Sequence, residues 1–154
     1  MSNIKKRCIL VAAVVALCLP VTLVLVTKQA NAHKEPHDAA TLKAFEDEFM
    51  NWVVLGDRLY HGDAAAAKEM GVTLSKTGMA CTMCHPIGSD ILPHEFPKFQ
   101  EQMSEFATLR DMVNWCIEKP NEGEKIDLNG DAMKALEAYM YWSAKGSMLD
   151  AGRH

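Results

Sequence analysis

The stretch Cys81-Thr82-Met83-Cys84-His85 carries the strongest signal in this chain of 154 residues. It has the form C-x-x-C-H, which is the attachment motif for c-type haem. Two thiols three positions apart reach the two vinyl groups on one porphyrin edge and form thioethers, and the next residue then lies under the iron. The motif therefore predicts one covalent haem c, with Cys81 and Cys84 as thioether residues and His85 as the proximal iron ligand.

Two other uses of a C-x-x-C pair agree less well with the surrounding sequence. A thioredoxin-like redox pair would follow a β-α-β pattern, and no such pattern precedes Cys81. A zinc site would need a second C-x-x-C or an H-x-x-H, and the chain contains neither. Export and a single copy of the motif in a small helical chain favour haem attachment instead.

The first 32 residues have the pattern of a signal peptide. A basic Lys5-Lys6-Arg7 group precedes the apolar stretch Cys8–Val26, and Ala30-x-Ala32 places small side chains before a cleavage site at His33. The apolar stretch is also just long enough to span a bilayer, so an uncleaved anchor is the alternative. We expect a signal peptide at 1–32 and an exported, periplasmic cytochrome c domain at 33–154.

Composition excludes several classes of protein. The chain is 49% hydrophobic and 23% charged, which is typical of a folded domain and not of a disordered chain. Its formal net charge is −4, and residues 33–154 are more acidic because the first 32 residues carry basic groups only. An acidic surface repels phosphate backbones, which excludes a nucleic-acid partner, and it favours redox protein partners with a basic docking face. Contact with a membrane is expected only if the N-terminal segment stays uncleaved.

Apolar periodicity predicts an all-α chain with a class I-like cytochrome c fold, in which the N- and C-terminal helices pack around the covalently attached haem. Asp38 is a candidate cap for the first helix, which contains an apolar stripe that we interpret as core packing: Leu42, Phe45, Phe49, Trp52, Val53 and Leu59. No segment shows the alternation of a strand. The predicted helices cover 38–60, 63–70, 99–119 with a possible break near 107–108, and 131–145.

The sixth iron ligand is not determined by the motif. Small electron-carrying cytochromes usually supply a methionine from the loop before the last helix, and here that connector, 120–130, contains neither Met nor His. The other candidates after the motif are His94, Met103, Met112, Cys116, Met133, Met140 and Met148.

Two of these candidates share one helical face. Leu109, Met112, Val113, Cys116 and Ile117 follow helical spacing, so both sulfur atoms point to one side of the helix. Cys116 has no disulfide partner once the motif cysteines hold haem. Its thiol is therefore an inert core thiol, an intermolecular cross-link or an iron ligand. For the distal iron ligand we favour Cys116, and Met112 is the alternative.

Beyond the motif, the chain resembles the SoxA and thiosulfate dehydrogenase class of c-type cytochrome domains. The resemblance covers roughly residues 45–154 and rests most specifically on N-x-C-I at Asn114–Ile117 and A-L-x-A-Y at Ala135–Tyr139. In that class the helix cysteine is the distal ligand of a catalytic haem, which implies this role for Cys116.

The chain also departs from that class. An arginine usually stands four residues before the ligand cysteine and binds the anionic sulfur substrate, whereas here that position is Met112 and Arg110 lies two residues earlier. The enzymes commonly carry two haems, and this chain has one motif. We therefore expect an electron carrier that transfers single electrons, rather than a catalyst. The alternatives are a haem subunit or enzyme of reduced-sulfur oxidation, and a haem-based sensor with a displaceable distal residue.

Overall fold

The computed structural model describes residues 37–146. The predicted signal peptide at 1–32 and the ligand candidate Met148 lie outside the described residues. The chain divides into two units, Met1–Leu42 and Lys43–His154, and almost everything described belongs to the second. Within 37–146, no helix is long and apolar enough to cross a membrane.

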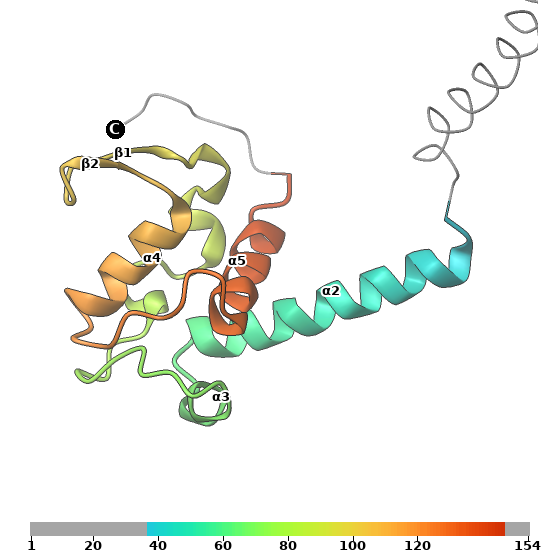
Figure 1. Cartoon of the computed structure of the whole chain (residues 1–154), viewed down its shortest axis with the longest axis horizontal. Helices are drawn as coiled ribbons and strands as arrows, with labels where there is room; N and C mark the ends of the chain where they lie inside the picture. Colours follow the sequence, from blue (N-terminus) through green and yellow to red (C-terminus); the bar gives the residue numbers. More distant parts are fainter. Residues whose placement is uncertain (1–36, 147–154) are drawn as a thin grey trace, which may run out of the picture. The chain divides into compact units, whose positions relative to one another are not determined.

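The described residues are mostly helical, as predicted (Figure 1). Short 3-10 turns and a small antiparallel hairpin fill the middle of the chain between the helices. In chain order the elements are α2 (Ala39–Tyr60), α3 (Ala64–Glu69), η1 (Cys81–Met83), η2 (Gly88–Ile91), η3 (Pro93–Glu95), β1 (Lys98–Gln100), β2 (Glu105–Ala107), α4 (Leu109–Glu118) and α5 (Asp131–Ser143).

Aspartate caps start the first two helices. The Asp38 carboxylate accepts the Thr41 amide at 2.7 Å, which confirms the cap predicted for α2. The Asp63 carboxylate accepts the amides of Ala65 and Ala66 and so begins α3. Between these helices Gly62 has a φ of 79°, a left-handed conformation that favours glycine and ends α2.

The first and last helices of the domain cross at a glycine. A Cβ added to Gly56 of α2 would lie 1.9 Å from the carbonyl oxygen of Ala135 in α5. Only a residue without a side chain permits this approach. Around the crossing both helices contribute to the core, which contains Val53, Leu59, Tyr60, Met133, Leu136, Tyr139 and Met140. This packing confirms the predicted pairing of terminal helices in a cytochrome c fold.

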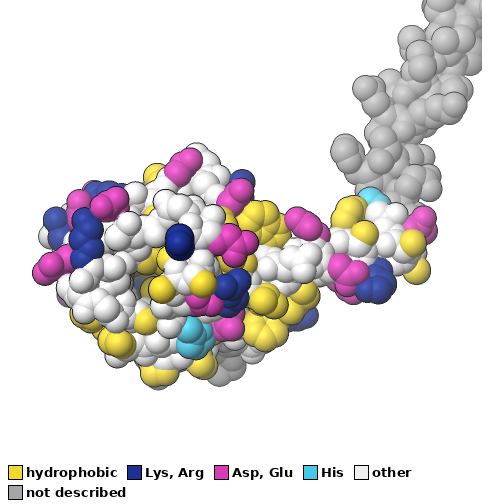
Figure 2. Space-filling model, turned by 90° about the horizontal axis from the view of Figure 1, so that it is seen from below, with side chains coloured by type: hydrophobic (Ala, Val, Ile, Leu, Met, Phe, Trp, Pro, Cys, Tyr) yellow, Lys and Arg dark blue, Asp and Glu magenta, His cyan; other side chains and the backbone are white. Residues whose placement is uncertain are grey.

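The apolar stripe of α2 is only partly a core face. Val53 and Leu59 are buried, but Leu42, Phe45 and Phe49 are 49%, 55% and 44% exposed, so the core-packing prediction is wrong for these three. Figure 2 shows hydrophobic side chains at the surface of this helix, beside acidic ones. Periodicity identifies the face of a helix that is apolar, but it does not show how far along that face the partner helix extends.

The predicted helix over 99–119 is wrong in its first part. Residues 98–107 form the hairpin β1–β2, with Phe99 directly opposite Phe106. These strands have three residues each, too few for alternation to be recognised in the sequence. The later part is confirmed: α4 starts after Thr108, whose hydroxyl accepts the Asp111 amide while the Asp111 carboxylate accepts the Thr108 amide. This reciprocal pair is a capping box.

Candidate functional site

The Cys81–His85 segment folds as a single tight turn. Residues Cys81–Met83 form η1, and the amides of Cys84 and His85 both donate to the Cys81 carbonyl, at 3.2 and 3.0 Å. Cys81 is half-buried and Cys84 is exposed. The turn therefore has one thiol facing the interior and one at the surface.

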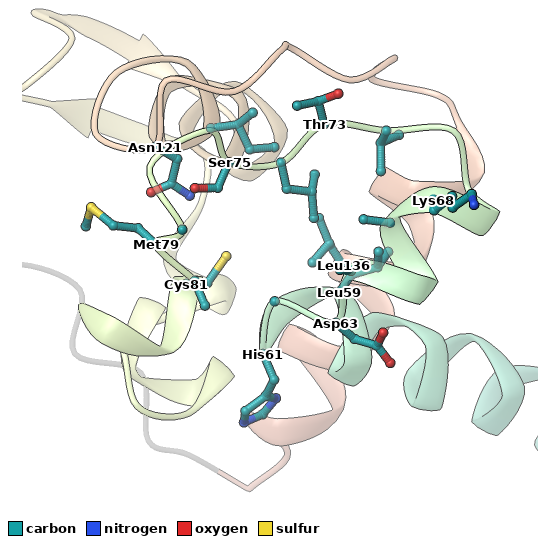
Figure 3. A pocket seen from close by; sticks show the side chains of 18 of the residues that line it. Leu59, His61, Asp63, Lys68, Thr73, Ser75, Met79, Cys81, Asn121 and Leu136 are labelled. Atoms are coloured by element: carbon teal, nitrogen blue, oxygen red, sulfur yellow. The ribbon is translucent and has the colours of Figure 1, made fainter.

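A cavity of about 650 Å³ adjoins this turn (Figure 3). Its volume lies in the range of about 300–1,000 Å³ that is usual for cofactor and ligand sites. Cys81 forms part of the wall, and Figure 3 shows its sulfur directed toward the cavity. Much of the remaining wall is apolar and comes from several elements: Leu59, Val72, Leu74, Val113, Ile117 and Leu136.

The other predicted site residues, Cys84, His85, Met112 and Cys116, do not line this cavity. Val113 and Ile117 of α4 line it, and Cys116 lies between them in the chain. Since successive helical residues are rotated by about 100°, Cys116 occupies the neighbouring part of the same helix surface. Met112 is partly buried one turn earlier, so the predicted stripe is confirmed as a face but the choice between its two sulfur atoms stays open.

The three cysteines lie within electrostatic reach of one another. Burial raises the pKa of Cys81 to about 11, with Cys116 as the next cause. Burial also raises the pKa of Cys116 to about 11, followed by the effect of Cys84. The fold therefore brings the α4 cysteine to the C-x-x-C turn across more than thirty residues of sequence. Thiols with such pKa values are protonated at neutral pH, and a thiolate there would need a cation such as a metal ion beside it.

The remaining ligand candidates are engaged elsewhere. The His94 Nε2 atom lies 3.3 Å from the carbonyl oxygen of Ala144, and its ring contacts Tyr141 at 5.4 Å. Met133 and Met140 of α5 are fully buried in the core. The burial of Met133 and Met140 agrees with their interpretation as packing residues, and Met103 lines a second cavity together with Trp115 of α4.

Two polar side chains, Asn114 and Arg110, hold α4 in place through contacts that the sequence did not predict. Asn114 is buried and forms a pair of hydrogen bonds with the backbone of Ile126, at 2.8 and 2.9 Å. Arg110 forms a bidentate contact with the Glu137 carboxylate of α5, at 2.9 and 2.8 Å, and also donates to the Leu128 carbonyl. The guanidinium of Arg110 thus joins α4 to α5 through Glu137.

Comparison with known proteins identifies this arrangement. Residues 69–149, which are just over half of the chain, match the family model of the SoxA/TsdA cytochrome c domain. The chain belongs to this family. A cytochrome c domain of this kind implies binding of haem c and electron transfer through the haem.

A curated relative gives a weaker and narrower match. The cytochrome c domain is 31% identical over 70 residues to a thiosulfate dehydrogenase from Psychrobacter arcticus. The match covers 40% of this chain but only 21% of that enzyme, so the chain spans about a fifth of the relative's length.

The donor set of this chain suits haem c. Two cysteines at the required spacing share one turn, a histidine follows immediately, and an apolar cavity adjoins them. Besides His85, which would bind the iron, α4 offers Cys116 or Met112 as a second donor, while Cys81 and Cys84 would hold the porphyrin.

Proposed function

We propose that this chain is a periplasmic cytochrome c that transfers single electrons through one covalently bound haem. The observation that carries the proposal is the C-x-x-C-H turn beside a largely apolar cavity, with Cys81 in the cavity wall. Residues 33–154 contain one such motif, which supports one haem per chain. The signal-like segment at 1–32 supports export.

In this proposal each residue at the site has a separate task. Cys81 and Cys84 hold the haem as thioethers, His85 is the proximal iron ligand, and Cys116 is the distal ligand, with Met112 as the alternative. Bound haem supplies a one-electron couple at neutral pH. The apolar side chains Leu59, Val113, Ile117 and Leu136 exclude water, and water exclusion together with axial ligation sets the potential.

Covalent attachment is the first test of the proposed function. We expect the purified mature protein to carry the added mass of one haem, to begin at His33 and to retain the haem after denaturation. Intact-protein mass spectrometry measures all three. A mature protein without added mass would contradict the whole proposal, whereas retention of residues 1–32 would favour the anchor.

We propose that electrons enter and leave beside the exposed motif cysteine. Cys84 is exposed, and its apolar neighbours Met83 and Ile87 are 65% and 52% exposed. An exposed apolar edge in an acidic protein suits a redox partner that has an apolar patch with basic residues around it.

Docking at this edge predicts a localised charge effect. Replacing Ile87 with lysine should slow electron exchange with a small basic redox protein by roughly tenfold at low salt, because the new charge repels the partner. Stopped-flow rates measured over a range of ionic strength test this, and added salt should reduce the difference. The control is Phe106→Lys, which adds the same charge on the hairpin β1–β2. Equal slowing by both variants would contradict docking at Cys84.

Oxidation of reduced sulfur compounds is the second candidate function. The similarity to a thiosulfate dehydrogenase favours it, as does the thiol of Cys116 near the motif. Against it, Met112 occupies the position where the class carries a substrate-binding arginine, and Arg110 is held by Glu137. A catalytic role would therefore require a positive group from another chain.

A further inference from the structure

Tyr60 connects the last turn of α2 to the end of the haem motif. Its hydroxyl donates to the backbone carbonyl of His85 at 2.7 Å and lies 3.2 Å from the carbonyl oxygen of Ile87. The side chain is only 1% exposed, and its ring packs against Tyr139 of α5 with centroids 5.0 Å apart. The hydroxyl therefore reaches both carbonyls from a position fixed by the core.

Inside the motif turn the remaining backbone hydrogen bonds are local, whereas the following Gly88 packs against α5. The amides of Cys84 and His85 donate to the Cys81 carbonyl inside the same turn, which determines the shape of the turn but not its position on the core. Tyr60 supplies a bond from a different element, and α2 is itself fixed by the close approach of Gly56 to Ala135. A bond between two elements restricts their relative motion, which bonds within one turn do not.

We propose that Tyr60 is a positioning residue for the proximal histidine. By holding the His85 carbonyl, it restricts the backbone from which the imidazole projects and so aims the ring at the iron. The inference rests on the proposed role of His85 as the iron ligand. In this role Tyr60, which lies outside the motif, helps to determine the orientation of the axial ligand.

The chemistry of the phenol suits this task. A buried hydroxyl is costly unless it is hydrogen-bonded, and here it has carbonyl acceptors. Phenylalanine would keep the ring packing and remove only the donor.

The test compares Tyr60→Phe with Tyr139→Phe in the haem-loaded protein. Tyr139 is the other buried member of the aromatic pair, and its hydroxyl interacts with Asp57 and the Gly88 backbone instead of His85. Loss of one intramolecular hydrogen bond corresponds to roughly a two- to tenfold change in a local equilibrium. For Tyr60→Phe we therefore expect exchange of the Cys84 and His85 amides to accelerate by roughly two- to tenfold relative to the amides of α5.

A change at the iron should accompany the faster exchange. In Tyr60→Phe the ferric low-spin spectrum should change and the reduction potential should fall, because a looser turn admits water, which favours the more charged ferric state. Tyr139→Phe should lose thermal stability but keep the ferric low-spin spectrum and the reduction potential. A purely structural role for Tyr60 would instead give two variants that differ in melting temperature alone, and that result would overturn the inference.

A measurement on the unmodified protein covers the case in which Tyr60→Phe does not accumulate. In the reduced, diamagnetic state, the Tyr60 hydroxyl proton should be slow to exchange and should show a nuclear Overhauser effect to the His85 segment. Rapid exchange of this proton would also overturn the inference. If His85 is not the iron ligand, the spectrum will be insensitive to Tyr60 while the amide exchange still accelerates, so the proposed function fails separately.

Discussion

Replacing His85 with alanine should prevent formation of the normal low-spin haem protein. In the proposed function His85 is the proximal iron ligand, so its removal would leave the iron with only a ligand from α4. We expect either failure of haem maturation or an unstable, five-coordinate product, visible as loss of the low-spin absorption spectrum. Yield of covalent haem and the ferric and ferrous spectra measure the effect.

His94→Ala is the matched control for this experiment. His94 is also a histidine that follows the motif, but its ring is held by the Ala144 carbonyl and Tyr141. Its replacement should leave the spectrum intact and lower stability only modestly. An unchanged low-spin spectrum in His85→Ala would show that His85 is not the ligand, and loss of the spectrum in His94→Ala would move the assignment to η3.

The second large effect is expected at Cys116. A thiolate donates charge to iron and stabilises the ferric form, so its removal should raise the reduction potential. For Cys116→Ser we expect an altered ferric spectrum and EPR signal and a rise on the order of 0.1 V, within the range of about 0.8 V that axial ligands cover. Met112→Leu, a change of similar volume one turn earlier, should alter both properties only slightly.

The reverse outcome would assign Met112 as the distal ligand. Cys116 would then be a packed core thiol, and sulfur-compound catalysis would lose its main support in this chain. Measuring the turnover of thiosulfate by the unmodified protein and by these two variants distinguishes an electron carrier from a catalyst. We expect little turnover by the isolated chain, because no arginine stands at position 112, and robust turnover would contradict the carrier proposal.

The sequence determined the features that depend on short-range spacing. The spacing of Cys81, Cys84 and His85 is a property of the sequence, so the haem-attachment motif could be recognised before the tertiary structure was known. A helix start depends on a side chain and amides two or three residues away, and the predicted starts at Asp38 and Asp63 are found in the structure. The terminal helices were predicted because their periodic stripes are long.

Tertiary structure decided how far each apolar face is covered and which distant groups meet. The stripe of α2 continues from Leu59 to Leu42, yet its first part is exposed, because burial depends on a partner that the helix's own sequence does not describe. The strand pair over 98–107 depends on two short segments meeting, which no local period records.

The site shows the same division. Spacing alone placed Met112 and Cys116 on one face, but only the fold brought the Cys116 thiol to the motif and committed Arg110 to Glu137. The hydrogen bond from Tyr60 to His85 joins residues 25 positions apart, and the sequence around either residue does not predict it. Neighbouring residues determine local geometry, whereas contacts between elements form only when the whole chain packs. The position of His85 depends on both.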